Sequence, residues 1–177
     1  MLTIWGRPTS ARTQKVLWAL AETGIEFEMI LASGTMGPNG SVDKGNEPYG
    51  VVDTPEYRAM NPNGTVPTIK DGDFTLWESN SVIQYLAMKY APEPLFGDDL
   101  EIFASASRWM DWEGNMFLPH QHTLVMHLVR LPPEERDPAQ GEGARQALLR
   151  PLKIIDSQLA KTSFISGERF TMGDIPI

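Results

Sequence analysis

The residues best suited to chemistry lie in one short stretch, Asn61 to Ser81, which reads NPNGTVPTIKDGDFTLWESNS. Pro67 belongs at the start or edge of a strand, because proline has no N–H to donate to a neighbouring strand. Eleven residues later, Glu78 and then Ser79 offer a carboxylate and a hydroxyl where a helix should begin and its first N–H groups are unpaired. A strand edge beside such a helix terminus suits a small zwitterionic peptide.

The elements that must position this stretch are a β-hairpin and two helix starts. Residues 70–73, Lys-Asp-Gly-Asp, predict a hairpin with a two-residue type I′ turn, because an Asp-Gly pair accepts positive φ values. Ahead of it, residues 2–31 read as strand, helix and strand, with Thr9 and Ser10 placed to cap the helix. A helix between two strands of one sheet predicts a parallel pair with a right-handed crossover.

The second half of the chain is predicted to be helical. Residues 91–97 contain Ala-Pro-Glu-Pro and predict a linker between an α/β domain of residues 1–90 and a helical domain of residues 98–177. Helices are expected over residues 101–130 and 144–160. The apolar residues expected to face inward on the second helix are Leu148, Leu149, Leu152, Ile155 and Leu159.

A capping box over residues 171–174, Thr-Met-Gly-Asp, predicts that another helix begins there. The sequence continues only to Ile177, so we expect the helical domain to be incomplete and apolar surface on the 144–160 helix to be exposed.

Composition excludes several classes of protein. Of the 177 residues, 41% are apolar, which is enough for a folded core. The net charge of −8, from 15 basic and 23 acidic residues, argues against a nucleic-acid partner. The absence of cysteine excludes disulfides and thiolate metal sites. No apolar run approaches the roughly 18 residues of a membrane span, so we expect a cytoplasmic protein with no membrane partner.

The three histidines do not predict a metal site. On a helix, His120 and His122 point to different faces, and His120 and His127 lie about 10 Å apart along the axis. We therefore expect no metal.

The order of elements and five motifs resemble a cytosolic glutathione transferase, most closely the bacterial, serine-type, theta/delta-like members. The motifs are WGRPTS at 5–10, NPNGTVP at 61–67, LWESN at 76–80, RWMDW at 108–112 and GERFT at 167–171. The resemblance covers nearly the whole chain. It implies a thioredoxin-like N-terminal domain with a mixed four-stranded sheet, an all-α C-terminal domain, and a homodimer.

The same resemblance implies an enzyme that conjugates the glutathione thiolate to small hydrophobic electrophiles in detoxification, with glutathione as co-substrate. It places the catalytic hydroxyl at Ser10, aimed at the glutathione sulfur. A hydrogen bond to a thiolate favours the ionised form, which lowers the thiol pKa from its usual value of about 8.5. Thr9 is a substitute for Ser10, and both residues also suit plain helix capping.

The resemblance also implies a glutathione-binding set: Thr65, Val66, Pro67, Glu78 and Ser79. Val66 precedes a cis proline and pairs its backbone with the cysteinyl unit. Glu78 accepts the γ-glutamyl ammonium, and Ser79 binds the α-carboxylate at the helix N-terminus. The alternative interpretation is that Glu78 and Ser79 are ordinary residues of the first helical turn with no binding role.

Further residues have two open interpretations. Arg12 reaches glutathione or is a solvated helix charge. Trp109, Trp112 and Met116 line an electrophile pocket or belong to the core or a dimer interface. Asp111 reaches the glutathione of a partner subunit or has no such contact.

Two other functions remain open. The first is a non-catalytic binding or regulatory protein, because fold does not fix function. The Ala32–Asp53 loop looks longer than its counterpart in similar sequences. A loop that obstructs the site favours the non-catalytic alternative, whereas a loop that acts as a lid does not. A glutathione-dependent reductase ranks last, because such relatives usually carry a cysteine at the position of Ser10.

Overall fold

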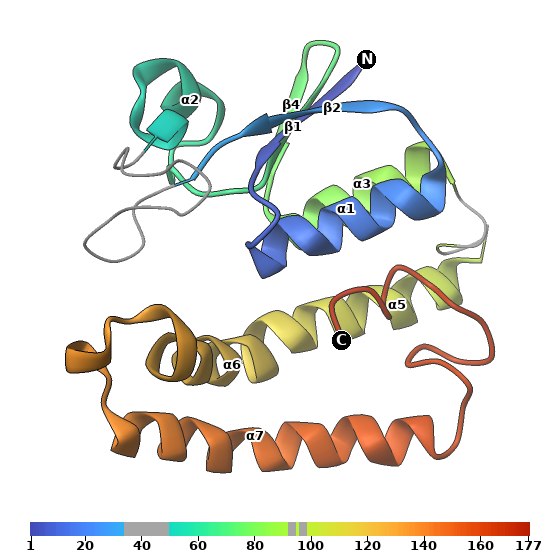
Figure 1. Cartoon of the computed structure of the whole chain (residues 1–177). Helices are drawn as coiled ribbons and strands as arrows, with labels where there is room; N and C mark the ends of the chain where they lie inside the picture. The colour runs from blue at the N-terminus through green and yellow to red at the C-terminus, as the bar shows by residue number, and fades with distance from the viewer. Residues whose placement is uncertain (34–49, 92–94, 96–98) are drawn as a thin grey trace. The chain divides into compact units, whose positions relative to one another are not determined.

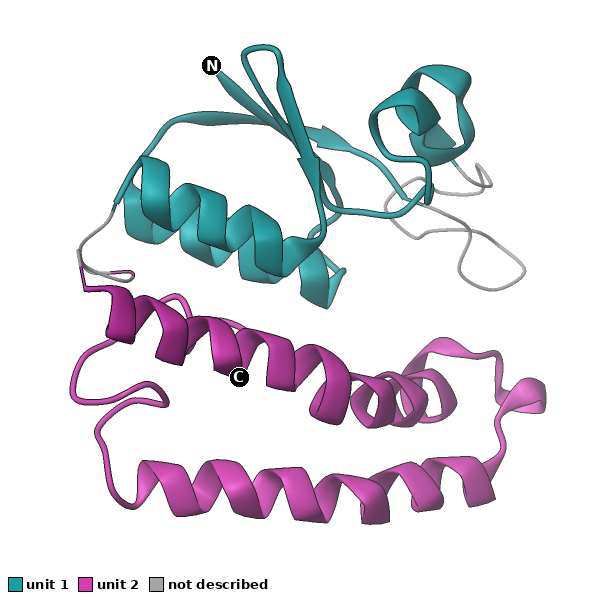
Figure 2. Ribbon diagram, turned by 180° about the vertical axis from the view of Figure 1, so that it is seen from behind, with its two compact units in different colours: residues 1–91 teal, residues 92–177 magenta. Residues whose placement is uncertain are grey.

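The computed structural model of the protein describes residues 1–33, 50–91, 95 and 99–177. The chain divides into two compact units, Met1–Ala91 and Pro92–Ile177 (Figure 2). Among the described helices, none is both long enough and apolar enough to cross a membrane.

The first unit is built on a four-stranded mixed sheet, as the sequence predicts. Its strands are β1 (Leu2–Gly6), β2 (Phe27–Leu31), β3 (Thr68–Asp71) and β4 (Phe74–Trp77), in the order β2-β1-β3-β4. Strand β1 pairs in parallel with β2 and antiparallel with β3, and β3 and β4 form the hairpin.

Two helices of the first unit lie side by side along the sheet (Figure 1). They are α1 (Ala11–Thr23) and α3 (Ser79–Lys89). The inward-facing residues of the two helices are fully buried, as are Ile4 and Ile69 of the sheet. These helix residues are Val16, Ala19, Leu20, Val82, Ile83 and Leu86. Helix α1 ends where Gly24 adopts a positive φ of 67° and its N–H bonds back to the last turn.

The hairpin forms where predicted, but the type I′ turn is wrong. Asp71 pairs with Phe74, so Gly72 and Asp73 are the two loop residues. Gly72 has a φ of 61°, whereas Asp73 is not among the residues with positive φ, which matches a type II′ turn with glycine first. Asp71 remains in the ladder because its carboxylate accepts hydrogen bonds from α3 and its C-terminal end. The donors are Tyr85 and Lys89 of α3 and Tyr90, the residue after α3.

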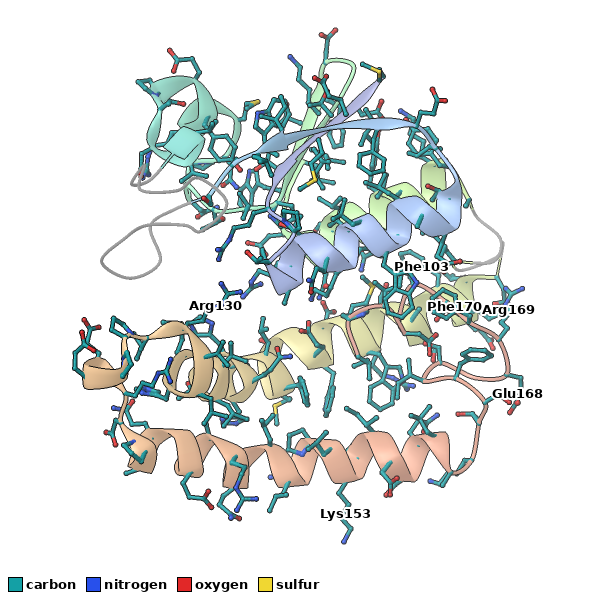
Figure 3. All side chains as sticks on the ribbon, viewed as in Figure 1. Phe103, Arg130, Lys153, Glu168, Arg169 and Phe170 are labelled. Carbon is teal, nitrogen blue, oxygen red and sulfur yellow. The ribbon has the colours of Figure 1, made fainter. Side chains whose placement is uncertain are left out.

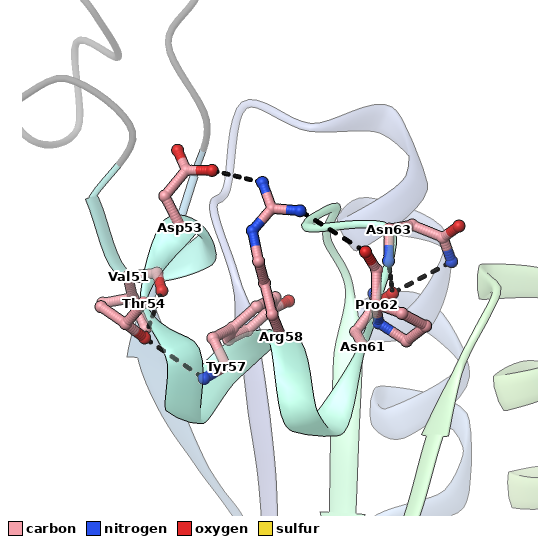
Figure 4. A network of polar contacts seen from close by, with 8 residues as sticks. All are labelled: Val51, Asp53, Thr54, Tyr57, Arg58, Asn61, Pro62 and Asn63. Atoms are coloured by element: carbon pink, nitrogen blue, oxygen red, sulfur yellow. Dashed lines mark hydrogen bonds and ion pairs between the residues drawn. The ribbon is translucent and has the colours of Figure 1, made fainter.

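A short helical segment leads into the loop before β3. It consists of the 3₁₀ turn η2 (Gly50–Asp53) and helix α2 (Pro55–Met60). The Thr54 hydroxyl caps α2 by accepting from the Tyr57 N–H at 3.2 Å, and Arg58 pairs with Asp53 at 2.5 Å (Figure 4). The predicted lid lies mostly outside the described residues, which resume at residue 50.

The described part of the second unit is helical, and its longest helix, α7, runs beside α6 (Figure 1). Pro119 is the second residue of α6, and the residues before it also have helical backbone angles. The predicted helix over residues 101–130 is interrupted by two π-helical turns rather than by a proline kink alone. The elements are α5 (Leu100–Trp112), η3 (Glu113–Phe117), α6 (Leu118–Val125), η4 (Met126–Arg130), η5 (Pro133–Glu135) and α7 (Pro138–Leu159).

Helix α7 differs from its prediction in two ways. It begins at Pro138, six residues before the expected start, because the Asp137 carboxylate caps the first turn and proline suits that position. Leu148 is buried as expected, but Leu149, Leu152 and Leu159 are exposed. The other buried residues of α7 are smaller than leucine: Gly141, Ala144 and Pro151.

The predicted capping box forms, but the residues after it are turns rather than a helix. The Asp174 carboxylate accepts from the Thr171 N–H at 2.8 Å, and the Thr171 hydroxyl accepts from the Gly173 N–H at 3.2 Å. The next backbone bonds span three residues, as in Ile177 N–H to Asp174 C=O at 3.2 Å, rather than the four of an α-helix. Just before the box, the Phe164 and Phe170 rings meet edge to face.

Candidate functional site

A cavity of about 320 Å³ opens in the first unit, where the loop before β3 approaches the N-terminus of α3. Its volume lies at the lower end of the range for small-molecule sites, about 300–1,000 Å³. All five residues of the predicted glutathione-binding set line it. The complete lining is Arg12, Asn63, Thr65, Val66, Pro67, Glu78 and Ser79.

Val66 presents an open backbone edge at this cavity. The Val66–Pro67 peptide bond is cis, as the resemblance implies, and β3 starts at the next residue, Thr68. The Val66 side chain packs against a buried cluster that includes Tyr57. Among the described residues, neither the N–H nor the C=O of Val66 has a hydrogen-bond partner. An extended peptide can satisfy both groups by adding itself as a short strand.

Glu78 has an unusual backbone conformation. It precedes α3 with a φ of 71°, the only positive φ of a non-glycine residue in the described part of the chain. Such a conformation costs about 1–3 kcal/mol and is concentrated at functional sites. The Glu78 side chain makes no capping bond to α3, so its carboxylate remains available at the cavity.

Ser79 is the first residue of α3 and is 3% exposed. The first N–H groups of a helix lack intrahelical acceptors and carry the positive end of the helix dipole. Next to the Glu78 carboxylate, the cavity therefore offers one acceptor for a cation and one donor group for an anion. This pairing fits the two ends of an amino acid.

Ser10 occupies the turn between β1 and α1, and it does cap the helix. Its Oγ accepts from the Thr13 N–H at 3.3 Å. The turn is tight at Gly6, because a Cβ there would lie 2.6 Å from the Thr13 Cγ2. A serine hydroxyl can accept one bond and still donate another, and no described residue accepts from the Ser10 hydroxyl. Capping and donation to a bound sulfur are therefore compatible.

Ser10 is not among the lining residues of the cavity, but Arg12, two residues further along α1, is. Thr9, its predicted substitute, is exposed at the same turn. Asn63 is a lining residue that sequence reasoning missed. The available signal was its place in the 61–67 motif, three residues before the predicted edge at Val66.

Of the candidate residues in the second unit, Trp109 lines a different cavity, whereas Trp112 and Met116 are not among its lining residues. Trp109 is 7% exposed and meets Trp112 edge to face at 5.3 Å, whereas Met116 is exposed. Trp109 lines a groove of about 540 Å³ along α7. Lys153, another lining residue, projects from α7 (Figure 3). Asp111 is exposed on α5.

The histidines do not form a cluster. The described ranges contain no group of three or more His, Cys, Asp or Glu side chains that could hold a metal ion. His127 has a structural role instead, because its Nδ1 accepts from the Asp137 N–H at 3.1 Å, ahead of α7.

A charged cluster ties the far end of the hairpin to α3. We call Asp71, Tyr85, Lys89 and Tyr90 the Asp71 cluster. The Asp71 Oδ2 accepts from the Tyr85 hydroxyl at 2.8 Å, the Lys89 ammonium at 2.6 Å and the Tyr90 hydroxyl at 2.5 Å. Burial raises the pKa of Asp71, but these three bonds outweigh it and lower the pKa to about 2. None of the four residues lines the cavity.

A family model for the glutathione S-transferase N-terminal domain matches residues 9–89. Glutathione S-transferase GstB of Escherichia coli K12 is 39% identical over 180 residues, covering 100% of this chain and 80% of its own. Glutathione S-transferase 3 of Zea mays is 30% identical over 178 residues, covering 98% and 73%.

Solved structures agree with these sequence relatives. A theta class glutathione S-transferase from Xanthomonas axonopodis pv. citri, with glutathione bound, superposes with a TM-score of 0.86 at 40% identity. That match covers 99% of this chain and 78% of the other. Glutathione transferase F2 from Populus trichocarpa gives a TM-score of 0.84 at 27% identity, covering 99% and 78%.

Proposed function

Because the chain belongs to the glutathione S-transferase family and is an enzyme of that class with glutathione as co-substrate, we propose that it conjugates glutathione to small hydrophobic electrophiles. The observation that carries the proposal is the unpaired Val66 edge in a cavity shared with Glu78 and the α3 N-terminus. These groups match the backbone, the ammonium and the carboxylate of a γ-glutamyl tripeptide.

Binding proceeds through three contacts. The cysteinyl unit adds to the Val66 edge as a short strand, with Pro67 and Thr65 flanking it. The Glu78 carboxylate accepts the γ-glutamyl ammonium. Ser79 and the first N–H groups of α3 receive the α-carboxylate, where the helix dipole favours an anion. Arg12 and Asn63 complete the rim of the cavity.

Ser10 activates the sulfur. Its hydroxyl donates to the glutathione sulfur and favours the thiolate, while its oxygen keeps the capping bond from Thr13. Lowering a thiol pKa by about two units needs roughly 2.7 kcal/mol of differential stabilisation. One charged hydrogen bond contributes about 1.5–3 kcal/mol, and the helix N-terminus adds to it. The thiol proton passes to solvent, the thiolate forms a bond to the electrophilic carbon, and the leaving group departs with its electron pair.

The setting of this activity belongs to the same proposal. The protein is a cytoplasmic homodimer that acts in detoxification, and exposed Asp111 is available to reach the partner subunit. Sedimentation should give about twice the chain mass of 19.8 kDa. A sedimenting monomer at micromolar concentration contradicts the dimer.

Two variants test the site. Glu78→Gln removes the charge that receives the ammonium, so calorimetry should show at least tenfold weaker glutathione binding with an unchanged fold by circular dichroism. Ser10→Ala should leave binding within about threefold but raise the pH midpoint of conjugation, because the thiolate loses its donor.

The outcomes separate the alternatives. An unmoved pH–rate profile in Ser10→Ala would leave Ser10 as a cap only. Glutathione binding without conjugation of a model aryl halide would favour the non-catalytic alternative instead.

A further inference from the structure

A buried polar network lies directly behind the Val66 edge, and we call its members, Tyr57, Asn61, Thr65 and Thr68, the Tyr57 network. The Tyr57 hydroxyl donates to the Thr65 carbonyl at 2.7 Å and lies 2.8 Å from the Thr68 Oγ1. The Asn61 Nδ2 donates to the same carbonyl at 2.9 Å and to the same hydroxyl at 3.0 Å. One backbone carbonyl, immediately before Val66, is thus held by two side chains.

The side chains of Tyr57, Asn61 and Thr68 are buried, whereas Thr65, which contributes its backbone carbonyl, is exposed. Tyr57 is 1% exposed, and Asn61 and Thr68 are each 0% exposed. Every polar atom has a partner when Thr68 donates to the Tyr57 oxygen and both Asn61 amide hydrogens are used. Burial raises the pKa of the Tyr57 phenol, so Tyr57 stays a neutral donor. A satisfied buried network has one geometry and resists rearrangement.

The network controls both flanks of the Val66 edge. On the inner side, the Thr65 carbonyl is fixed and the Val66 side chain packs against the cluster that contains Tyr57. On the loop side, the Asn61 Oδ1 accepts from the backbone N–H and the side-chain amide of Asn63, both at 3.1 Å (Figure 4). Asn63 and Val66 both line the cavity, so Asn61 connects the network to two of its walls.

We propose that Tyr57 and Asn61 are positioning residues for glutathione, which hold the Val66 edge in its binding geometry before the ligand arrives. This inference rests on the proposed function. Ordering the backbone of one residue costs about 1–2 kcal/mol, so an edge that must be ordered on binding weakens affinity. A rigid edge avoids that cost and acts on binding rather than on the chemical step.

The test compares two tyrosines that each lose only a hydroxyl. Tyr57→Phe removes a donor to Thr65, and Tyr85→Phe removes a donor to Asp71 in the other cluster. We expect Tyr57→Phe to raise the glutathione Kd about threefold to tenfold, with kcat at saturating glutathione within about twofold. We expect Tyr85→Phe to lower the unfolding midpoint in urea and to leave Kd unchanged.

A modified ligand locates the effect. Glutathione methylated on the cysteinyl nitrogen cannot donate from that nitrogen to the Val66 edge. The Tyr57→Phe penalty should shrink to under about twofold with this ligand, because the pairing that the variant loosens is already missing. An equal penalty with both ligands would overturn the inference, as would an unchanged Kd for glutathione in Tyr57→Phe.

The two proposals fail in different ways. If the unmodified protein binds no glutathione, the proposed function fails. If it binds glutathione, Glu78→Gln weakens binding and Tyr57→Phe does not, only the positioning role fails.

Discussion

The Tyr57 network and the Asp71 cluster use the same phenol chemistry for different ends. In the first, the hydroxyl is buried and its partners are neutral: the carbonyl of Thr65, which lines the cavity, and the hydroxyl of Thr68 at the start of β3. In the second, the partners are charged, Lys89 is half exposed, and the cluster joins a hairpin end to the end of a helix. Buried neutral bonds fix the geometry of a loop, whereas exposed charged bonds fasten elements that already have their own hydrogen bonds.

The largest loss of stability is expected from Asn61→Ala, in the Tyr57 network. This change removes two donors and leaves the Thr68 hydroxyl and the Asn63 N–H with fewer partners in a buried setting. Urea unfolding should show a loss of about 2–4 kcal/mol. Asn63→Ala, which removes only the exposed end of the contact, should cost under about 0.5 kcal/mol. Equal losses in Asn61→Ala and Asn63→Ala would contradict the distinction between buried Asn61 and exposed Asn63.

A smaller effect, with a pH signature, is expected from Asp71→Asn. At pH 7 the loss should be about 1–2 kcal/mol, because the charged acceptor of three bonds becomes neutral. The pKa of Asp71 is lowered to about 2 from an ordinary value of 3.8. Its stabilisation is therefore complete above about pH 4 and disappears as the pH falls toward 2.

Unfolding curves of the two proteins should thus converge between pH 4 and 2, while glutathione affinity at pH 7 stays equal. A gap that persists unchanged at pH 2 would contradict a contribution from the charge of Asp71.

The smallest effect is expected from Lys89→Met. The Lys89 side chain is 46% exposed, so its ion pair with Asp71 is screened by water and contributes little to stability. Methionine keeps an apolar stem near the Tyr85 and Tyr90 rings, which lie 5.4 and 5.1 Å from the Lys89 nitrogen. The difference in unfolding free energy should shrink further in 0.5 M salt. A loss larger than that of Asp71→Asn contradicts this ranking.

The sequence predicts those parts of the molecule that depend on local patterns. The alternation and periodicity of residues 2–31 and the Pro67-led hairpin indicate the mixed sheet, and Gly24 marks the end of α1. Of the five lining residues from Thr65 to Ser79, Pro67, Glu78 and Ser79 were indicated by their residue types and positions, whereas Thr65 and Val66 were reached through the resemblance.

Features that depend on distant partners were not predictable in the same way. The hairpin turn differs because Asp71 has partners 14 to 19 residues away. The exposed face of α7 differs from the prediction because packing against α6 determines which side chains of α7 are buried. The sequence of α7 alone does not indicate that α6 is its partner. The φ of Glu78 and the role of Asn61 behind Val66 likewise require the tertiary structure.

Position 78 illustrates a conflict between durability and activity. A left-handed backbone there would be most comfortable with glycine, which has no Cβ to strain. Any engineering effort that ranks substitutions by thermal resistance alone will therefore be drawn to replace this glutamate, and each success by that measure would delete the carboxylate that we propose as the anchor for the incoming amine.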